Sequence, residues 1–279
     1  MSKEHDAVPA SRALPTGPIA LANGEMTPPE RSLMSRVRNR LALLDRSRAA
    51  KLRLSTPVAT FTFDDFPASA YAKGGAILEE YGVRGTYFIS GRFLNSTING
   101  IEYTTAEQLK LINANGHEIG CHTFDHEALG ARPSAFARAT CQKNGAFLRQ
   151  IFGTTFKMSS FAYPYGDVSP RAKHVMSSQF EFCRGIRAGV NDGMADLAQI
   201  RILSLEQYHW NPTAVEQAIS DARGKSVWLV FLSHDVSDSP SPYGSTPDQI
   251  RRTLHALKQA AIPVKTLKAA AAYGGIYES

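Results

Sequence analysis

From Thr56 to the C-terminus, short runs of β-branched and aromatic residues alternate with longer amphipathic segments, and this alternation restricts the fold more than any other feature. A strand followed by a helix and another strand forms a βαβ unit with parallel strands. Six or more such units favour a closed (β/α) barrel over an open sheet. The predicted strands are Val58–Phe63, Thr86–Ile89, Glu118–Cys121, Ser160–Tyr163, Glu181–Ile186, Ile200–Leu203, Val227–Leu232 and a short last one at Pro263–Lys265.

Capping residues, prolines and glycines mark the helix boundaries between these strands. Thr104 stands three residues before Glu107, which predicts a capping box that opens a helix stopping at Gly116. A capping residue directly before a proline marks two further helix starts, at Asn211 and Thr246. The other predicted helices are Ala68–Tyr81 and Pro133–Phe152.

The first 54 residues differ in composition from the rest of the chain. Residues 1–30 contain five prolines and show no periodicity, which predicts a disordered or loosely packed arm. Residues 31–50 carry apolar residues at spacings of three and four, which predicts an amphipathic helix in a basic extension at 31–54. Eight of the nine charged residues in 31–53 are basic, whereas the whole chain carries only +6. The barrel domain is then expected at residues 55–279.

The N-terminal segment lacks the apolar run of a secretory signal peptide, so we expect a cytoplasmic protein. A basic amphipathic helix can lie on an anionic leaflet, which makes peripheral contact of residues 31–50 with the inner membrane a hypothesis. The alternative is a helix that packs against the barrel or in a dimer contact. Nucleic acid is not expected as a partner, because no aromatic residue is interleaved with the arginines of this segment.

Four polar clusters each directly follow or end a predicted strand: Asp64-Asp65, His122–His126, Tyr163–Gly166 and His234-Asp235. Because the carboxyl ends of parallel strands meet at one end of a barrel, we expect all four clusters to lie together. The sequence contains no Gly-rich phosphate loop, nucleophile elbow or dinucleotide fingerprint that would indicate another chemistry.

Two of these clusters together have the composition of a metal site. The spacing of His122 and His126 would place both imidazoles on one side of a helical turn, within reach of one ion. Asp65 is predicted to complete a three-ligand set with open positions, as in catalytic zinc sites. Asp64 would stay unligated and take a proton from a water molecule that the cation activates. Zinc is expected from the ligand types, with cobalt, nickel and iron as alternatives.

The other two clusters supply an acid and a hydrogen-bond donor. His234 follows a strand too apolar to be exposed, and we predict that it protonates the leaving amine; a buried structural histidine is the alternative. The turn Tyr163–Gly166 can direct backbone amides at a developing oxyanion, which assigns that role to the N–H of Tyr165; a plain aromatic turn fits equally well. Metal, base, acid and oxyanion donor together indicate hydrolysis of an amide or ester.

The same residues resemble the motifs of the polysaccharide deacetylase family with the NodB homology domain, carbohydrate esterase family 4. TFTFDD, ending in Asp64-Asp65, is similar to its first motif, and His122–His126 to the second. FAYPYG at Phe161–Gly166 is similar to a variant of the third motif, and Leu232-Ser-His234 to the fifth. The resemblance covers about residues 55–270. It implies a distorted (β/α) barrel, a zinc-type metal and de-N-acetylation of glycans, with Leu232 beside the acetyl methyl group.

Three positions depart from the family's motifs. Phe66 stands where the family often has Gly, and Ala162 stands where many members have an Arg that orients the base. Arg184 or Arg201, on nearby predicted strands, is the expected replacement for that Arg. The fourth motif, usually an Asp–Trp pair, has only Trp210 as a remnant, and we expect Trp210 and Tyr163 to contact substrate.

In the stretch TFDDFPASAY, and in lacking a signal peptide, the chain resembles the cytoplasmic deacetylases of bacterial exopolysaccharide and holdfast pathways. This implies an N-acetylated polysaccharide or a lipid-linked oligosaccharide as substrate. Two alternatives stay open: a hydrolase of another N-acyl or cyclic amide substrate, and an inactive glycan-binding module of the same fold. A homo-oligomer is also open.

Overall fold

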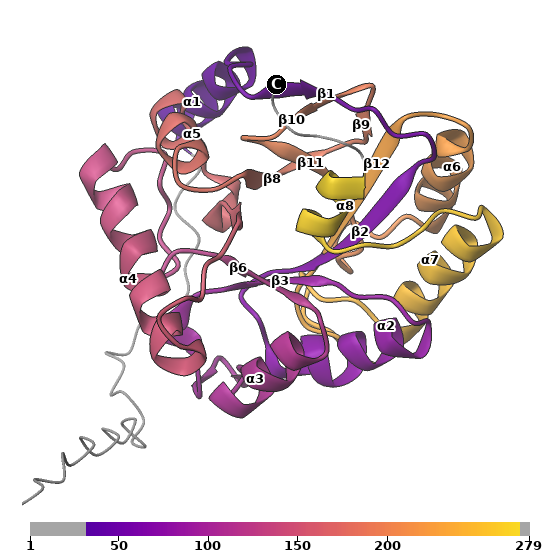
Figure 1. Cartoon of the computed structure of the whole chain (residues 1–279), viewed down its shortest axis with the longest axis horizontal. Helices are drawn as coiled ribbons and strands as arrows, with labels where there is room; N and C mark the ends of the chain where they lie inside the picture. The colour runs from indigo at the N-terminus through magenta and orange to yellow at the C-terminus, as the bar shows by residue number, and fades with distance from the viewer. Residues whose placement is uncertain (1–31, 274–279) are drawn as a thin grey trace, which may run out of the picture.

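Seven parallel strands close into a barrel in the computed structural model, which describes residues 32–273 (Figure 1). The pairing of β11 with β12 closes the ring. The predicted fold class, a distorted (β/α) barrel, is therefore confirmed; the predicted arm at 1–30 lies outside the described residues. The barrel strands are β2 (Val58–Phe63), β3 (Thr86–Ile89), β6 (Glu118–Cys121), β7 (Ser160–Ala162), β8 (Phe182–Ala188), β11 (Ile200–Ser204) and β12 (Val227–Ser233).

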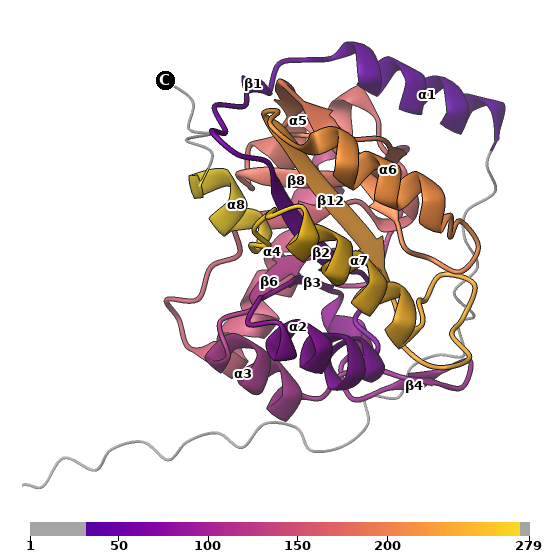
Figure 2. The ribbon, with the colours of Figure 1, turned by 90° about the vertical axis from the view of Figure 1, so that its right-hand side faces the viewer.

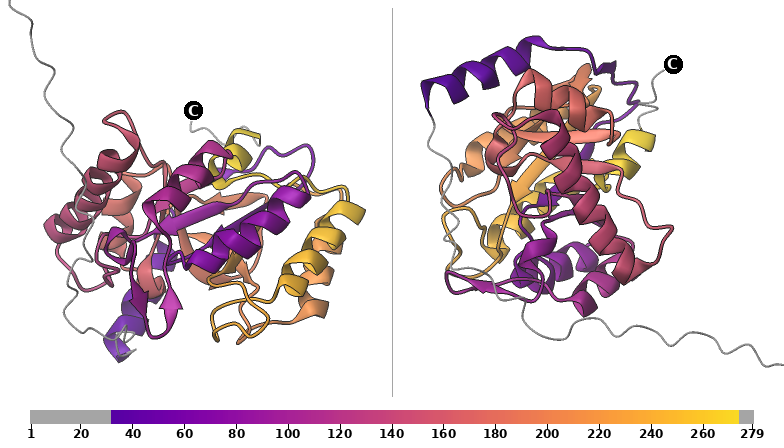
Figure 3. Two further views of the ribbon diagram at one scale, coloured as in Figure 1. Left: turned by 90° about the horizontal axis from the view of Figure 1, so that it is seen from below. Right: turned by 90° about the vertical axis from the view of Figure 1, so that its left-hand side faces the viewer.

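Helices cover the outside of the barrel between successive strands (Figure 3). None of the helices between residues 32 and 273 is long and apolar enough to cross a bilayer. They are a π-helix at Ala70–Gly75 that continues into α2 (Ala76–Glu80), α3 (Ala106–Ala114), α4 (Ser134–Phe152), α5 (Pro170–Ser177), α6 (Pro212–Ala222) and α7 (Pro247–Gln259). Short elements complete the chain: β4 (Thr97–Ile98), β5 (Ile101–Glu102), β9 (Asn191–Asp192) and 3₁₀ turns at Gly91–Phe93 and Pro164–Gly166.

Helix α8 (Leu267–Tyr273) closes the end of the barrel at which the strands begin. The Leu267 N–H donates to Thr86 Oγ1 (2.9 Å), and the Lys268 N–H donates to Glu118 Oε2 (2.8 Å). Thr86 and Glu118 are the first residues of β3 and β6. The polar clusters lie at the opposite end of the barrel, where the strands finish.

The strands β2 and β12 are buried at every position, which explains why neither contains a charged residue. Side chains alternate between the barrel interior and the helix layer. Trp228 and Leu232 belong to the interior cluster together with residues of α8, whereas Phe231 packs in the outer cluster. Asp64 and His234 lie directly beyond β2 and β12 and continue the interior rows.

Most predicted strands agree with the structure within one or two residues, but the last one is wrong. Pro263–Lys265 forms only a single bridge, Val264 to Ala59, on the part of β2 that β3 leaves unpaired, and helix α8 begins soon afterwards at Leu267. The caps at Asn211 and Thr246 are confirmed.

The predicted capping box of α3 lies one residue too early. Thr105 is the cap and Gln108 its partner, because the two side chains exchange hydrogen bonds with each other's backbone N–H. Thr104 instead donates its hydroxyl to Gln108 Oε1 (3.1 Å). Glu107, one residue further into the helix, is not the partner.

The helix predicted for residues 31–50 is also too long. Helix α1 spans only Leu33–Leu44, and Ala49–Lys51 forms a strand, β1, antiparallel to β10 (Met194–Asp196). The chain turns because Lys173 Nζ, buried under the helix, binds the Ala42 carbonyl (2.9 Å) and the Asp45 carbonyl. Those carbonyls end the helix at a fixed place.

Candidate metal centre and catalytic site

Three predicted ligands meet at the end of the barrel where the strands finish. Asp65 follows β2, and His122 and His126 follow β6; all three are buried, and their ligand atoms lie within 4.8 Å of one another. Asp65 Oδ1 is 2.9 Å from Nε2 of His126 and 3.4 Å from Nε2 of His122. The predicted helical turn is wrong, since both histidines lie in a loop, and His126 has a φ of 55°.

The donor set fits a divalent cation. His122 Nδ1 lies 2.8 Å from the Ala162 carbonyl, which can only accept, so Nδ1 carries the hydrogen and Nε2 has a free lone pair. Asp65 Oδ1 is buried and makes no well-directed hydrogen bond within the described residues, although both Nε2 atoms face it. Convergence of a carboxylate oxygen and two imidazole lone pairs is typical of a zinc-type ligand set.

The protonation states of His126 and Asp65 also suit metal binding. Burial alone would lower the pKa of His122, but Asp64 and Asp65 outweigh burial and raise it. Burial lowers the pKa of His126, against the opposing influence of Asp65, which favours the neutral imidazole that a metal requires. Burial alone would raise the pKa of Asp65, but His126 and His122 outweigh it and hold that pKa well below its usual value. The carboxylate is therefore ionised. The ring of Tyr165 lies against His126, with a centroid distance of 4.4 Å, and helps to fix its orientation.

Asp64 lies beside the ligand cluster and has a cationic partner inside the barrel. Asp64 Oδ2 is 3.9 Å from His122 Nε2, and Asp64 Oδ1 accepts from the guanidinium of Arg184. Arg184, from β8, is fully buried. It thus takes the place of the family arginine that is missing at Ala162. Arg201 does not, since its guanidinium lies near two other arginines.

The backbone at Asp65 and Phe66 explains the family's glycine. Both residues have positive φ angles, 59° and 68°, a region that glycine adopts most readily. Phe66 holds this conformation because its side chain is fully buried and packs on Tyr87, with ring centroids 4.7 Å apart. Packing therefore compensates for the unfavourable backbone geometry and keeps the Asp64-Asp65 turn in place.

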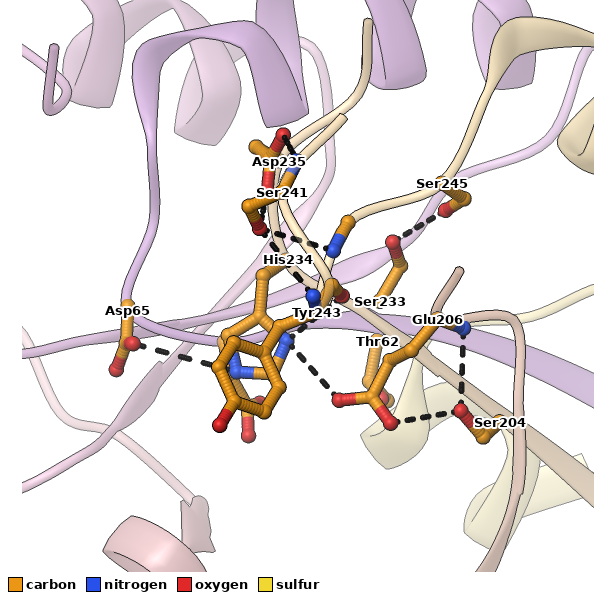
Figure 4. A network of polar contacts seen from close by, with 12 residues as sticks. Thr62, Asp65, Ser204, Glu206, Ser233, His234, Asp235, Ser241, Tyr243 and Ser245 are labelled. Carbon is orange, nitrogen blue, oxygen red and sulfur yellow. Dashed lines mark hydrogen bonds and ion pairs between the residues drawn. The ribbon is translucent and has the colours of Figure 1, made fainter. Parts of the chain in front are cut away.

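His234 lies on the other side of the cluster and is held by an acidic residue that the sequence analysis missed (Figure 4). His234 Nε2 is 4.0 Å from Asp65 Oδ2, and His234 Nδ1 is 3.4 Å from Glu206 Oε1. Glu206 is itself fixed, because its Oε2 accepts from Ser204 Oγ (2.7 Å). Glu206 lies two residues after the end of β11, at the same end of the barrel as the four predicted clusters.

The predicted substrate contacts fare unequally. Tyr163 is fully buried and donates its hydroxyl to the Ala198 carbonyl (3.1 Å), so it is a core residue, and its prediction as a sugar contact is corrected. Trp210 is half-buried and packs against the outer core cluster. The residue from this part of the chain that reaches His234 is Glu206. Leu232 belongs to the interior cluster two residues before His234, a position compatible with its predicted role.

Two exposed tyrosines, Tyr208 and Tyr243, lie on loops near His234. The Tyr208 N–H donates to the Pro242 carbonyl (2.9 Å), which joins the loop after β11 to the loop after β12. The Tyr243 carbonyl lies 3.2 Å from His234 Nδ1, and its ring centroid is 5.7 Å from the histidine ring. Both tyrosine side chains are exposed, although large aromatic residues usually find a place in a core.

A (β/α) barrel that carries one carboxylate, two histidines, an unligated carboxylate and a further histidine at one end has the layout of a metal-dependent hydrolase. The family model for polysaccharide deacetylase matches residues 51–179. This match supports membership of the polysaccharide deacetylase family, and the distorted (β/α) barrel has the NodB-type fold of carbohydrate esterase family 4.

Individual relatives agree with this assignment. A bifunctional xylanase/deacetylase from Pseudobutyrivibrio xylanivorans is 24% identical in an alignment of 184 residues, and the alignment covers 62% of this chain but only 29% of that protein. A family 4 acetyl xylan esterase from Clostridium thermocellum, in complex with a cobalt ion, has a TM-score of 0.53 at 20% identity, covering 79% of this chain and 93% of that one. The chitin deacetylase of Colletotrichum lindemuthianum reaches 0.57 at 19% identity, covering 78% and 89%. At these identities the solved structures show the shared fold.

Proposed function

We propose that this protein is a metal-dependent N-deacetylase that removes acetyl groups from N-acetylhexosamine residues of a bacterial polysaccharide. The observation that supports this most strongly is that the two adjacent carboxylates, Asp64 and Asp65, have different partners. Asp65 lies with His122 and His126, as a ligand would, whereas Asp64 turns to Arg184 and keeps its carboxylate outside the set. A hydrolase needs both groups, one to hold the cation and one to accept a proton.

A bound divalent ion, preferably zinc, would polarise the amide carbonyl and lower the pKa of a nearby water molecule. The protein's own groups then divide the proton transfers. Asp64 accepts the proton of the attacking water, with its carboxylate oriented by Arg184. His234 donates to the leaving amine, with its ring held by Glu206. The N–H of Tyr165, in the turn beside His126, faces the developing oxyanion.

The two exposed tyrosines support a sugar polymer as substrate. Tyr208 and Tyr243 offer flat, amphipathic faces on two joined loops next to His234, where a glycan chain can lie across the site. We further propose an exopolysaccharide or adhesin precursor, presented as a lipid-linked oligosaccharide on the cytoplasmic face of the inner membrane. The sequence resemblance to exopolysaccharide-type deacetylases is the support for that choice.

The test is acetate release from N-acetylglucosamine oligomers by the zinc-loaded protein. Wild type should release acetate, and chelator should abolish it. Asp64→Asn should lower the rate by about 100-fold or more, the usual contribution of a positioned base. Asp221→Asn, an exposed acid on α6, is the matched control and should behave as wild type.

Two outcomes would overturn the proposal. Turnover of small N-acyl amides without turnover of any glycan would indicate the other substrate class. Stoichiometric metal with no turnover on a panel of acetylated glycans would indicate an inactive glycan-binding module.

A further inference from the structure

Helix α1 is amphipathic, but its small and polar side chains face the protein, whereas a surface helix usually turns its apolar side chains toward the core. Ala42 is fully buried, and Asn39 Oδ1 accepts from the Val168 N–H at 2.7 Å. Ser35 Oγ lies 3.5 Å from the carboxylate of Asp167. The side of α1 that contacts the barrel domain therefore provides hydrogen bonds and a close approach rather than an apolar seam.

Large apolar side chains cover the opposite side of α1 and point away from the protein. Their exposed fractions run from 42% to 78%. At the α-helical rotation they fall within an arc of about 100°, so they form one continuous stripe rather than scattered contacts. Figure 2 shows α1 at the outer edge of the molecule. The members of this α1 stripe are Leu33, Met34, Val37, Leu41 and Leu44.

The orientation of α1 is held by a buried charge. Lys173 of α5 has no exposed side-chain surface, and its Nζ binds the Ala42 and Asp45 carbonyls and the Asp196 carboxylate. Turning the stripe inward would remove the Ala42 and Asp45 carbonyls from this buried ammonium group and leave it only the Asp196 carboxylate, which is unfavourable. The outward stripe is therefore a fixed feature of the fold.

Arginines border the stripe on both sides. By helical rotation Arg36 and Arg40 lie along one edge and Arg38 along the other. An apolar stripe with cationic side chains at both edges is the pattern of a helix that lies flat in a membrane interface, with its apolar side chains below the headgroups. We propose that α1 docks the protein onto an anionic lipid surface.

A second copy of the chain fits this surface less well. The 12-residue helix is only about 18 Å long, and its stripe is small beside the roughly 800 Å² per partner that stable complexes bury. A twofold contact through the stripe would also bring the arginines of the two copies together. Anionic headgroups neutralise those arginines instead.

The placement also relates the helix to the site. Asp167 and Val168, on which α1 rests, lie two and three residues after Tyr165, whose ring packs on His126. A membrane under α1 would therefore lie near one of the loops that form the metal centre. Membrane docking itself does not depend on the deacetylase proposal, because vesicle binding is measured without any substrate.

The test is co-sedimentation of the full chain with vesicles of phosphatidylcholine alone and of phosphatidylcholine mixed with phosphatidylglycerol. Wild type should bind the mixed vesicles and lose binding as salt is raised. The double variant L41S/L44S should weaken binding by at least about tenfold, since both side chains are exposed and their loss leaves the core intact. Leu111→Ser, an exposed leucine on α3, is the matched control and should bind as wild type.

Point variants are preferable to truncation, because Leu52 and Leu54, just beyond α1, are core residues that a larger deletion would remove. Equal binding of L41S/L44S and wild type would overturn the proposal. A dimer in solution that L41S/L44S dissociates, together with no vesicle binding by wild type, would overturn it in favour of a second copy.

Discussion

Asp64 and Arg184 face each other inside the barrel, where neither side chain reaches bulk water. Such a pair contributes little net stability compared with apolar packing, but breaking it leaves an unpaired buried charge. The pair therefore has a positional role: it turns one carboxylate of the Asp64-Asp65 turn away from the ligand cluster. The missing third-motif arginine is thus replaced from a different strand, β8.

Arg184→Met should lower the turnover number by about 100-fold, because Asp64 loses the group that orients it. It should also destabilise the fold by about 3–5 kcal/mol, the usual cost of breaking a buried pair. The double change R184M/D64N should regain part of that stability but none of the activity. Urea denaturation and acetate release measure both effects; Arg201→Met is the control, and an equal loss there would contradict the assignment.

Glu206→Gln should lower the turnover number by about tenfold or more with little change in KM. The amide cannot support the protonated ring that His234 needs as the proton donor as well as a carboxylate does. Zinc stoichiometry should stay unchanged, because Glu206 is not in the ligand cluster. The exposed Glu216→Gln is the control, and an unaffected Glu206→Gln enzyme would show that Glu206 has no part in orienting His234.

The sequence predicts some of these residues better than others. Asp65, His122 and His126 could be placed together because each follows a parallel strand at once. Tyr163 was misjudged, because strand alternation turns it into the core although its neighbour Tyr165 reaches His126. The choice of Arg184 over Arg201 depends on which strand face lines the barrel, and the sequence alone left both open.

At the scale of elements, α2 and β6 are joined by a histidine with a defined tautomer. His117, just before β6, accepts from the Gly85 N–H at Nδ1 (3.0 Å), so its hydrogen lies on Nε2, 3.0 Å from Glu79 Oε1. Burial lowers the pKa of His117 below 6.5, despite the nearby Glu79. Protonation at Nδ1 would break the bond to Gly85.

This histidine should make stability depend on pH. With a lowered pKa, His117 binds fewer protons in the folded than in the unfolded chain, so its contribution is complete above 6.5 and is lost as the pH falls below it. The urea midpoint should therefore drop between about pH 7.5 and about pH 5.5, and His117→Asn should flatten that drop. His255→Asn, exposed on α7, should not; equal slopes in all three proteins would contradict this.

An element boundary can be predicted from the sequence when its cause is local, and not when its cause lies far along the chain. The strand positions and the caps at Asn211 and Thr246 depend on nearby residues and were predicted well. The end of α1 depends on Lys173, about 130 positions away, and the single bridge at Val264 depends on Ala59 of β2, about 200 positions away. Neither cause is visible in a local pattern.

At the scale of the whole molecule, barrel closure brings residues from position 64 to position 234 to one end. The parallel arrangement, which the sequence does predict, makes this convergence necessary. What it does not predict is the orientation of attached parts, such as the outward apolar stripe of α1. The account as a whole depends on one centre, in which Asp65, His122 and His126 share a divalent ion.

Calorimetric titration of the chelator-treated protein with Zn²⁺ tests that centre most directly. Wild type should bind one ion, and Asp64→Asn should still bind one, because Asp64 lies outside the ligand set. Asp65→Ala and His126→Ala should each weaken binding by about 100-fold or more. Unchanged zinc affinity in Asp65→Ala and His126→Ala would contradict the proposed centre and the hydrolytic mechanism built on it.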